Sequence, residues 1–241
     1  MNKRKKFGQH FLTSTSIAKF IVNESKITKN DLVYEIGTGK GVLVPLLCKY
    51  AKHVITTEID KKLYDDAIRN FSKLPNLTIN KGDGFKNEPE FDIFVSNLPY
   101  SKSRIAIQWL LPKKFSLAMI MVQRDFAEKL LTNSMRQRRA ISVLSQYGFD
   151  MKIVKKVKNT NFSPQPKVDS VVLKITQNQI VTKELIETIN KLFSYRRKTI
   201  QNIVKNFGIT IKSDIRLEDM TNNEIIKLAK KISRVLSISA C

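Results

Sequence analysis

The stretch that most restricts the folds open to this chain is residues 32–50. Residues 32–36 (Leu-Val-Tyr-Glu-Ile) have the apolar and β-branched character of a strand, and residues 42–50 are predicted to form a helix. Between them lies the loop Gly37-Thr38-Gly39-Lys40-Gly41. A strand, a glycine loop and a helix in this order are typical of the nucleotide-binding opening of a doubly wound α/β sheet. The G-x-G-x-G spacing differs from the G-x-G-x-x-G that cradles a dinucleotide, and it suits an amino-acid tail packed against bare backbone.

Acidic side chains end three successive predicted strands. Glu35 lies near the end of the first strand, Glu58 ends the strand 53–58, and Asp83 follows the strand 77–80 between two glycines. Glu58 comes about 20 residues after the glycine loop begins, the usual distance for a carboxylate that binds ribose hydroxyls. Asp83 is placed to reach the amino group of an adenine, although a surface Gly-Asp-Gly turn is the alternative interpretation. Three acids at one sheet edge would favour a cationic ligand such as a sulfonium.

A rigid polar elbow, Ser96-Asn97-Leu98-Pro99-Tyr100, follows the next predicted strand. Ligands of open α/β sheets bind at this carboxyl edge. Asn97 offers a side-chain oxygen acceptor, and Pro99 restricts the backbone so that the Leu98 carbonyl points to the same place. Two acceptors converging on an NH2 group would favour a tetrahedral nitrogen, whose free lone pair can attack a methyl donor, and Tyr100 would stack on the base. The alternative is an ordinary strand-to-helix turn.

The charge of the chain indicates a polyanionic partner. Its 241 residues include 43 lysines and arginines against 21 acids, a formal net charge of +22. Such an excess favours nucleic acid. A membrane surface is the competing polyanion, but no apolar run approaches the ~20 residues of a spanning helix, and no secretory signal is expected. Cys48 and Cys241 lack metal-ligand spacing, so we expect a reduced, cytoplasmic protein without a metal site.

Two further segments are candidates for contact with nucleic acid. The run Met135-Arg136-Gln137-Arg138-Arg139 is a cationic hinge before a predicted helix, and its three arginines are predicted to touch phosphate. The loop 161–167 (Asn-Phe-Ser-Pro-Gln-Pro-Lys) joins the segments 149–157 and 168–176, which are predicted to form a closing antiparallel pair of strands. Because two prolines stiffen this loop, an exposed Phe162 would clamp the free face of a flipped base. The alternative for Phe162 is an anchor in the core.

Several helix starts can be predicted from capping residues. Ser14 or Ser16 is expected to cap a helix over residues 17–22, and Asp60 a helix over residues 61–71. Thr221-Asn222-Asn223-Glu224 is a capping box that opens a last helix through Leu236.

Composition shifts after Thr176, and we predict that the chain divides there. Residues 1–176 would form the α/β domain with a basic N-terminal arm, and residues 177–241 a small helical domain. Residues 184–206 form an amphipathic helical stretch that carries Tyr195-Arg196-Arg197-Lys198 midway. The predicted fold class is α/β, a Rossmann-like sheet with a small C-terminal helical domain.

A set of motifs, in order along the chain, resembles that of the small-subunit ribosomal RNA adenine N6,N6-dimethyltransferases. The motifs are Gly8-Gln9-His10-Phe11-Leu12, Glu35–Gly41, Glu58, Gly82-Asp83, Asn97-Leu98-Pro99-Tyr100, Phe162–Val168 and Phe193-x-x-Arg196-Arg197-Lys198. Each is weak alone, but together they span residues 7–208. The resemblance implies a class I methyltransferase sheet that uses S-adenosyl-L-methionine to dimethylate two adjacent adenines in a hairpin loop near the 3′ end of small-subunit rRNA. It also implies a pre-30S ribosomal particle as partner, and we expect a monomer.

The resemblance also implies roles for individual residues. His10 and Leu12 would cover the methionine part of the cofactor, Glu58 would bind the ribose, and Asp83 the adenine. The expected cofactor-binding set is His10, Leu12, Glu35, Gly37, Gly39, Glu58, Ile59, Asp83 and Asn97. The expected catalytic and base-binding set is Asn97, Leu98, Pro99, Tyr100 and Phe162. The expected RNA-binding set is Arg136, Arg138, Arg139, Arg196, Arg197 and Lys198.

Two departures from the family pattern favour an archaeal-like member. Bacterial members commonly have Asn at the position of His10, and after Tyr100 they commonly read Asn-Ile-Ser-Thr-Pro where this chain has Ser101-Lys102-Ser103-Arg104-Ile105. The second departure concerns the pocket for the target base rather than the reaction.

Three rival functions remain. Antibiotic-resistance methyltransferases of 23S-type rRNA usually have Ile at the position of Leu98. DNA adenine methyltransferases usually have an acid or Ser at the position of Asn97. A non-catalytic ribosome-assembly factor would keep the fold only to bind RNA, and the intact acids and Asn97 argue against it.

Overall fold

The computed structural model describes residues 8–238, with side chains described through Val235. These residues form two compact units. The first contains residues 8–109, 114–127 and 151–177, and the second contains residues 110–113, 128–150 and 178–238. The basic run Lys3–Lys6 and Cys241 lie outside the described residues. The functions expected of the two predicted domains stay predictions.

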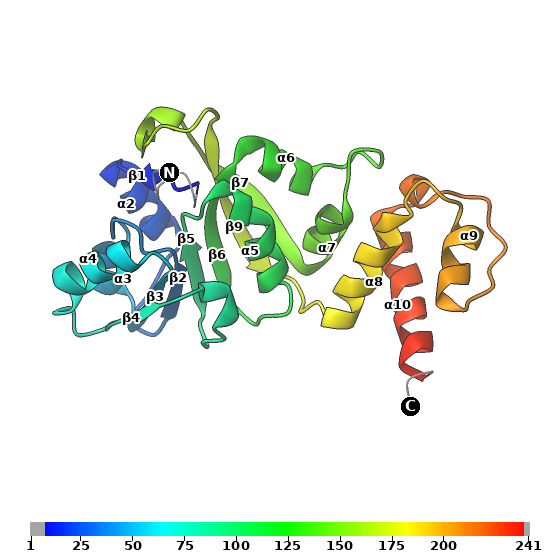
Figure 1. The fold of residues 1–241 in the computed structure, drawn as a ribbon, viewed down its shortest axis with the longest axis horizontal. Coiled ribbons are helices and arrows are strands. Elements are labelled where there is room, and N and C mark those ends of the chain that lie inside the picture. The colour runs from blue at the N-terminus through cyan, green and yellow to red at the C-terminus, as the bar shows by residue number, and fades with distance from the viewer. Residues whose placement is uncertain (1–7, 239–241) are drawn as a thin grey trace. The chain divides into compact units, whose positions relative to one another are not determined.

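The first unit is built on a seven-stranded sheet (Figure 1). The strand order is β4 (Leu77–Lys81), β3 (His53–Glu58), β2 (Leu32–Ile36), β5 (Ile93–Ser96), β6 (Leu117–Gln123), β9 (Ser170–Gln177) and β7 (Phe149–Val157). The first five are parallel, and β9 runs antiparallel to β6. Because parallel strands point the same way, the carboxyl ends of β2, β3, β4 and β5 meet at one edge. The predicted α/β sheet is confirmed.

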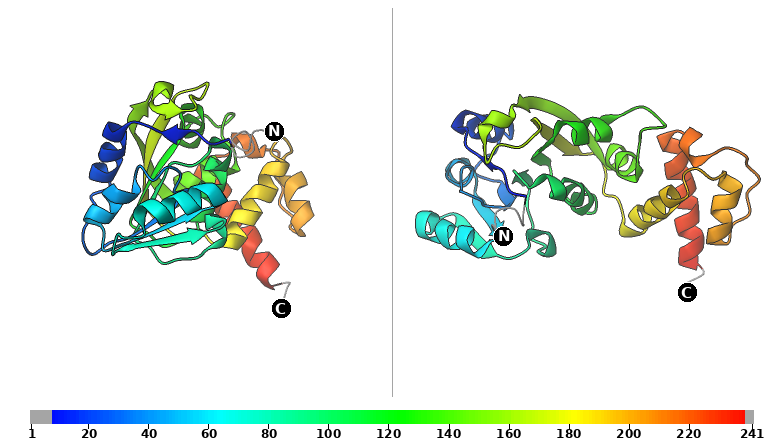
Figure 2. Two further views of the ribbon diagram at one scale, coloured as in Figure 1. Left: turned by 60° about the vertical axis from the view of Figure 1, so that its left-hand side comes forward. Right: turned by 45° about the horizontal axis from the view of Figure 1, so that its top comes forward.

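Helices connect the strands and cover the sheet (Figure 2). They are α2 (Thr15–Glu24), α3 (Val44–Tyr50), α4 (Lys61–Phe71), α5 (Ser103–Leu110) and α6 (Arg124–Leu131). The predicted caps are confirmed: Ser14 accepts from the Ile17 N–H, and Asp60 accepts from the N–H groups of Lys62 and Leu63. Side-chain oxygens thus satisfy donors that have no partner inside the first turn.

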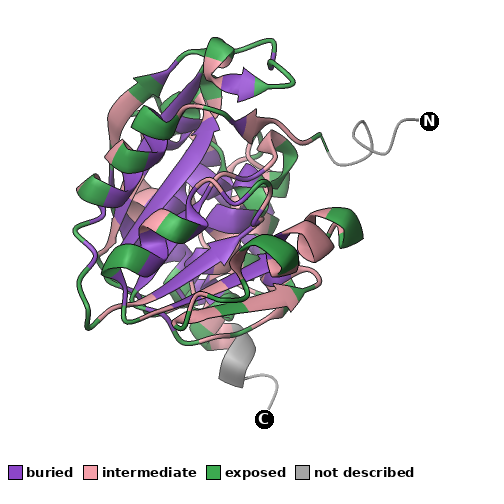
Figure 3. Ribbon diagram, turned by 90° about the vertical axis from the view of Figure 1, so that its left-hand side faces the viewer, coloured by how far each residue is buried: buried purple, intermediate pink, exposed green. Residues whose placement is uncertain are grey.

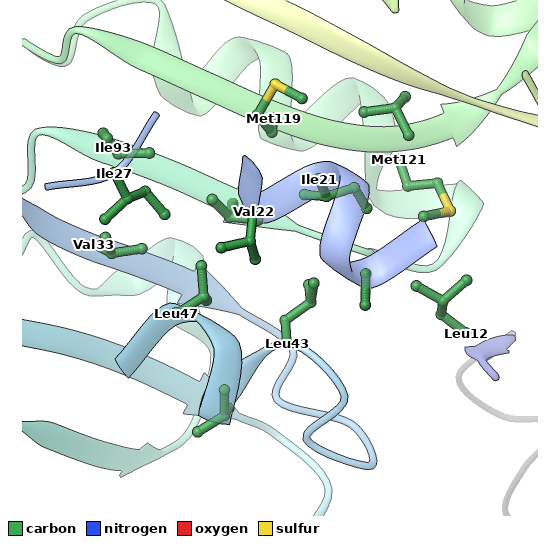
Figure 4. Close-up of a cluster of buried hydrophobic side chains, with 14 of the residues drawn as sticks. Leu12, Ile21, Val22, Ile27, Val33, Leu43, Leu47, Ile93, Met119 and Met121 are labelled. Atoms are coloured by element: carbon green, nitrogen blue, oxygen red, sulfur yellow. The ribbon is translucent and has the colours of Figure 1, made fainter. Parts of the chain in front are cut away.

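The central strands are buried on both faces, as expected of parallel strands covered by helices (Figure 3). On one face, Val33 and Ile93 pack in an apolar cluster with Leu47 of α3 and Ile21 of α2 (Figure 4). On the other face, aromatic rings pack together, namely Tyr34, Phe91, Phe94 and Trp109. Neighbouring residues such as Val33 and Tyr34 therefore belong to different cores.

The second unit is helical. It contains α7 (Ala140–Gly148), α8 (Lys183–Ser194), α9 (Ile200–Val204) and α10 (Asn222–Ile238). The predicted capping box is confirmed, since the Thr221 N–H donates to Glu224 Oε2 at 2.7 Å and the Glu224 N–H donates to Thr221 Oγ1 at 3.3 Å.

The prediction of one helical stretch over residues 184–206 is wrong in its middle. Helix α8 ends at Ser194, and the Lys198 N–H donates to the Tyr195 carbonyl in a turn. Thr199 is extended and forms a β-bridge with Arg216 before α9 begins. The spacing of apolar residues that predicted one helix is a local pattern. It gives no sign of this pairing between Thr199 and a segment further along the chain.

Arg138 is buried, and the prediction that it touches phosphate is wrong. It is 5% exposed, and its Nη1 donates to Asn222 Oδ1 at 2.9 Å. Its Nη2 donates to the carbonyls of Met220 and Leu217. A guanidinium removed from water requires such acceptors. Arg138 therefore ties the loop before α7 to the start of α10.

We predict that Arg138→Ala destabilises the protein by about 2–3 kcal/mol, because it leaves buried acceptors without their charged donor. Arg139→Ala is the matched control, since Arg139 is exposed and its Nη1 donates to the carbonyls of the adjacent residues Gln137 and Arg138. Urea unfolding followed by far-UV circular dichroism measures both changes. Equal losses of stability in the two variants would contradict the anchoring role.

Candidate active site at the carboxyl edge of the sheet

A pocket opens at the carboxyl edge of the sheet, within the first unit. It encloses about 1020 Å³ of space, a volume that includes open solvent at its mouth. Every residue of the predicted cofactor set lines it, namely His10, Leu12, Glu35, Gly37, Gly39, Glu58, Ile59, Asp83 and Asn97. Leu98 and Pro99 also line it. The structure thus brings these residues together, and their roles toward a ligand stay predictions.

The glycine loop follows β2 in a left-handed backbone conformation that favours glycine. The φ angles of Gly37, Gly39 and Gly41 are +87°, +58° and +74°. A Cβ on Gly41 would lie 2.1 Å from Cε2 of Phe71, so the loop packs against the end of α4. The Gly37 N–H donates to the Thr57 carbonyl at 2.8 Å. Gly37 and Gly39, which line the pocket, therefore present backbone without a side chain to its wall.

Glu58, the last residue of β3, holds this loop in place. Its Oε2 accepts from the Gly39 N–H at 2.9 Å, and its Oε1 accepts from the Asp60 N–H at 2.8 Å. Glu58 is 2% exposed, and burial raises the pKa of its carboxyl, while the backbone N–H groups oppose that rise. Because a carboxylate accepts up to about four hydrogen bonds, Glu58 keeps capacity for a ligand hydroxyl.

Glu35 is a second buried acid, 1% exposed, and it forms a hydrogen-bond chain across the strands. The Thr56 hydroxyl donates to Glu35 Oε2 at 2.6 Å, and Thr38 Oγ1 lies 2.7 Å from Thr56 Oγ1. Burial raises the pKa of Glu35 to about 8, a rise that Thr56 opposes and Glu58 increases. The two threonines were not predicted, although Thr56 stands opposite Glu35 in the β2–β3 register.

Tyr34 positions the loop that carries Asp83. Its hydroxyl donates to the Gly84 carbonyl at 2.8 Å and lies 3.2 Å from Thr57 Oγ1. A Cβ on Gly84 would lie 2.8 Å from Cγ1 of Ile36, so the glycine allows close packing on β2. Asp83 Oδ1 accepts from the Phe85 N–H at 3.1 Å. Asp83 is thus an ordered cap at the pocket rather than a free surface turn.

The elbow after β5 places Asn97 in the pocket wall. The Ser96 hydroxyl donates to the Ile36 carbonyl at 2.6 Å, which ties the elbow to the end of β2. Asn97 Nδ2 lies 3.5 Å from the His10 carbonyl, to which it donates. With Nδ2 directed at the backbone, Oδ1 is the atom left to accept a hydrogen bond from a ligand.

Residues 9–12 line one wall of the pocket, and we call this segment the strap. Strand β1 (Phe11–Leu12) pairs antiparallel with β8 (Phe162–Ser163). Thr13 donates twice to the Asn161 carbonyl, at 2.8 Å from its N–H and 2.9 Å from its hydroxyl. His10 Nδ1 lies 2.8 Å from the Pro164 carbonyl. The strap thus joins the pocket to the predicted base-binding loop.

The two predicted base-stacking rings are not both free. The Tyr100 ring stacks on the His10 ring with centroids 5.5 Å apart, and its hydroxyl lies 2.7 Å from Ser170 Oγ. Phe162 is 4% exposed and packs in the core opposite Leu12. The prediction of an exposed Phe162 is wrong, and the alternative of a core anchor is confirmed. Burial of such a ring stabilises a fold by roughly 2–3 kcal/mol. The buried position of Phe162 is therefore favoured over one in which the ring is exposed to solvent on the loop.

The remaining predicted RNA contacts lie on the surface of the second unit. Arg136, Arg139, Arg197 and Lys198 are exposed, and Arg196 is half-buried.

Among residues 8–238 no group of three or more His, Cys, Asp or Glu side chains is arranged to hold a metal ion. Within the same residues, no helix has the length and apolar character needed to cross a bilayer.

Glu35 generates a pH prediction. Because its folded pKa of about 8 exceeds the ordinary 4.5, the folded state holds a proton that the unfolded state releases. Its stabilising contribution is complete below pH 4.5 and is lost as pH rises through 8. Relative to Glu35→Gln, the wild type should lose up to about 1.4 kcal/mol of unfolding free energy per pH unit in that window. Urea titrations at several pH values measure this, and parallel pH profiles would contradict it.

Comparison with known proteins agrees with this geometry. Residues 1–238 match the model of the family described as ribosomal RNA adenine dimethylase. A probable ribosomal RNA small subunit methyltransferase A from Methanococcus aeolicus is 36% identical, covering 96% of this chain and 92% of the relative. A ribosomal RNA small subunit methyltransferase A from Thermotoga maritima is 32% identical, covering 98% and 88%.

Solved structures share the fold. A dimethyladenosine transferase from Plasmodium falciparum superposes with a TM-score of 0.79 at 26% identity, covering 94% of this chain and 98% of that chain. The 23S rRNA methyltransferase ErmE has a TM-score of 0.69 at 21% identity, covering 92% and 99%, which shows the fold alone. On the match of nearly the whole chain to one family model, supported by these relatives, the chain belongs to the ribosomal RNA adenine dimethylase family of enzymes.

Proposed function

We propose that this protein transfers methyl groups from S-adenosyl-L-methionine to N6 of two adjacent adenosines in the 3′-terminal hairpin loop of small-subunit (16S) rRNA. It would act in the cytoplasm, as a monomer, on a maturing small subunit during ribosome biogenesis. The family supports adenine dimethylation of ribosomal RNA, and the names of the relatives from Methanococcus aeolicus and Thermotoga maritima support the small subunit.

The donor set of the pocket fits S-adenosyl-L-methionine. Gly37 and Gly39 offer bare backbone to its amino-acid part, Glu58 an acceptor for ribose hydroxyls, and Asp83 an acceptor near the adenine. Ile59 lines the pocket with half of its surface exposed, which suits contact with a planar base. When bound, the cofactor supplies an electrophilic methyl group on a sulfonium. Glu58 and Asp83 line the pocket with acceptors that favour a cation, whereas Glu35, with its pKa of about 8, is mostly protonated at neutral pH.

The observation that carries the proposal is the position of Asn97 in the wall of the pocket. Its Nδ2 is engaged by the His10 carbonyl, so Oδ1 can accept from an adenine amine at the pocket wall. Adenine N6 is a poor nucleophile because its lone pair is delocalised into the ring. An acceptor at Asn97, helped by the Leu98 carbonyl, would stabilise the nitrogen as it becomes tetrahedral. Positioning contributes roughly 7–11 kcal/mol of barrier lowering, and one well-placed hydrogen-bonding group about 3–4 kcal/mol.

Base and RNA binding would use the surfaces beside this wall. Tyr100 would stack on the target base after the His10 ring moves from it. Stacking contributes about 1–3 kcal/mol per base. Arg136, Arg139, Arg196, Arg197 and Lys198 would contact phosphates.

We predict that Asn97→Ala lowers kcat for methyl transfer to rRNA by about 100-fold or more, because the acceptor at the reacting nitrogen is lost. Affinity for S-adenosyl-L-methionine, measured by isothermal titration calorimetry, should stay within about threefold of wild type. Ser101→Ala is the matched control, since Ser101 is exposed beside the elbow and does not line the pocket. Near-normal turnover of Asn97→Ala would refute the assignment.

Methyl transfer from radiolabelled S-adenosyl-L-methionine to undermethylated small subunits tests the proposed substrate. Large subunits and DNA serve as parallel substrates. We expect label in small-subunit rRNA, recovered as N6,N6-dimethyladenosine. Label confined to large subunits would indicate a 23S-type enzyme, label in DNA a DNA methyltransferase, and binding without transfer an assembly factor.

A further inference from the structure

We propose that a lysine-rich surface on β7 and α2, outside the active site, binds the phosphate backbone of the rRNA substrate and leads it toward the pocket. This β7 lysine surface consists of Lys19, Lys26, Lys152, Lys155, Lys156, Lys158 and Lys174, all in the first unit. The proposal rests on the proposed function, because it names how that substrate is held.

Strand β7 supplies most of the charge. It is the edge strand of the sheet, next to β9, so one of its sides carries no neighbouring strand. Lys152, Lys156 and Lys158 are exposed. Val157, between Lys156 and Lys158, is buried and fixes the strand to the core. From Lys152 to Lys158 the extended chain spans roughly 20 Å. A rigid strand therefore presents a row of cations rather than a flexible tail.

Helix α2 extends the same surface. Lys155 Nζ lies 4.7 Å from the centre of the Phe20 ring, which brings α2 beside β7. Lys174 of β9 donates to Glu24 Oε1 at 2.8 Å. The pKa of Glu24 is lowered first by this hydrogen bond and further by the charges of Lys174, Lys26 and Lys152. Glu24 thus stands among several ammonium groups, and with the exposed Asp150 of β7 it makes two acids against the seven lysines of the surface.

The surface is continuous in the chain with the pocket. After Lys158 the chain forms a short turn over Asn159–Asn161 and then β8, which pairs with β1. Strand β1 and His10 line the pocket. An RNA strand that follows β7 toward its carboxyl end would therefore arrive at the strap beside Asn97.

The chemistry of the surface favours RNA over a membrane. Membrane-binding surfaces combine cations with exposed apolar anchors. The large exposed apolar side chains of the described residues are Tyr50, Ile59, Ile105, Met135, Val168, Ile180 and Ile215, and none lies on α2 or β7. Lysines without such anchors match a phosphate backbone read without sequence preference. The structural alternative is that lysine on an edge strand only prevents pairing with other chains.

The test compares full-length wild type with Lys152→Gln/Lys156→Gln. The matched control is Lys62→Gln/Lys73→Gln, which removes two exposed lysines from α4 and its end, beside β4 at the other edge of the sheet. Filter binding to naked small-subunit rRNA over a salt series gives the slope of log affinity against log salt. Each lost phosphate contact lowers this slope by about 0.7–0.9. For Lys152→Gln/Lys156→Gln, here called the β7 variant, we expect the magnitude of this slope to fall by about 1.4–1.8. We expect the slope of the control variant to equal that of wild type.

Equal slopes for all three proteins overturn the proposal. A second outcome also overturns the proposal: the β7 variant aggregates, as seen by light scattering, while the salt slope of its monomeric fraction is unchanged. The lysines would then only prevent the edge strand from pairing with other chains. Loss of binding to phosphatidylserine vesicles without loss of RNA binding is a third outcome that overturns the proposal. Methyl transfer by wild type to small subunits is measured in parallel. Its absence, together with a reduced slope in the variant, would refute the proposed function while supporting the surface.

Discussion

The Glu58 carboxylate is the interaction on which the pocket depends. It accepts from the backbone of Gly39 in the glycine loop and from Asp60 at the start of α4. One buried acid at the end of β3 thus fixes the loop after β2 and the helix after β3 at the same time. Without it, two partly buried backbone donors would lose these partners, a loss that costs at most roughly 1–3 kcal/mol each. The bare backbone that faces the pocket therefore owes its shape to a charge on the neighbouring strand.

The distribution of charge separates two tasks. The chain has a net charge of +22, yet the acids Glu58 and Asp83 line its pocket. Parallel strands produce this separation, because they bring residues far apart in sequence to one edge. Many lysines, such as Lys152, lie on outer surfaces, where long side chains remain hydrated, although Lys40 and Lys102 line the pocket. A cation and a polyanion can thus be attracted to neighbouring parts of one small protein without competing for the same residues.

Whether a feature could be predicted from the sequence depended on how far apart along the chain the interacting residues lie. Asp60 and the Thr221–Glu224 capping box act within one turn, and both were confirmed. The meeting of Glu35, Glu58 and Asp83 follows from a general rule for parallel strands. Arg138 and Phe162 were misjudged, because their partners lie in distant segments. Arg138 reaches Asn222, 84 residues away, and Phe162 packs opposite Leu12. A charge run or a proline-rich loop gives no local sign of such partners.

The pairing of β1 with β8 has a consequence for synthesis of the chain. Residues that close one wall of the pocket are made some 150 residues before Asn161 and Pro164, which hold them. A nascent chain that has not reached Pro164 has its glycine loop and elbow but no fastening for the strap. This wall of the pocket can therefore be fastened only after the five parallel strands have been made, shortly before synthesis of β9, which lies between β6 and β7 in the sheet.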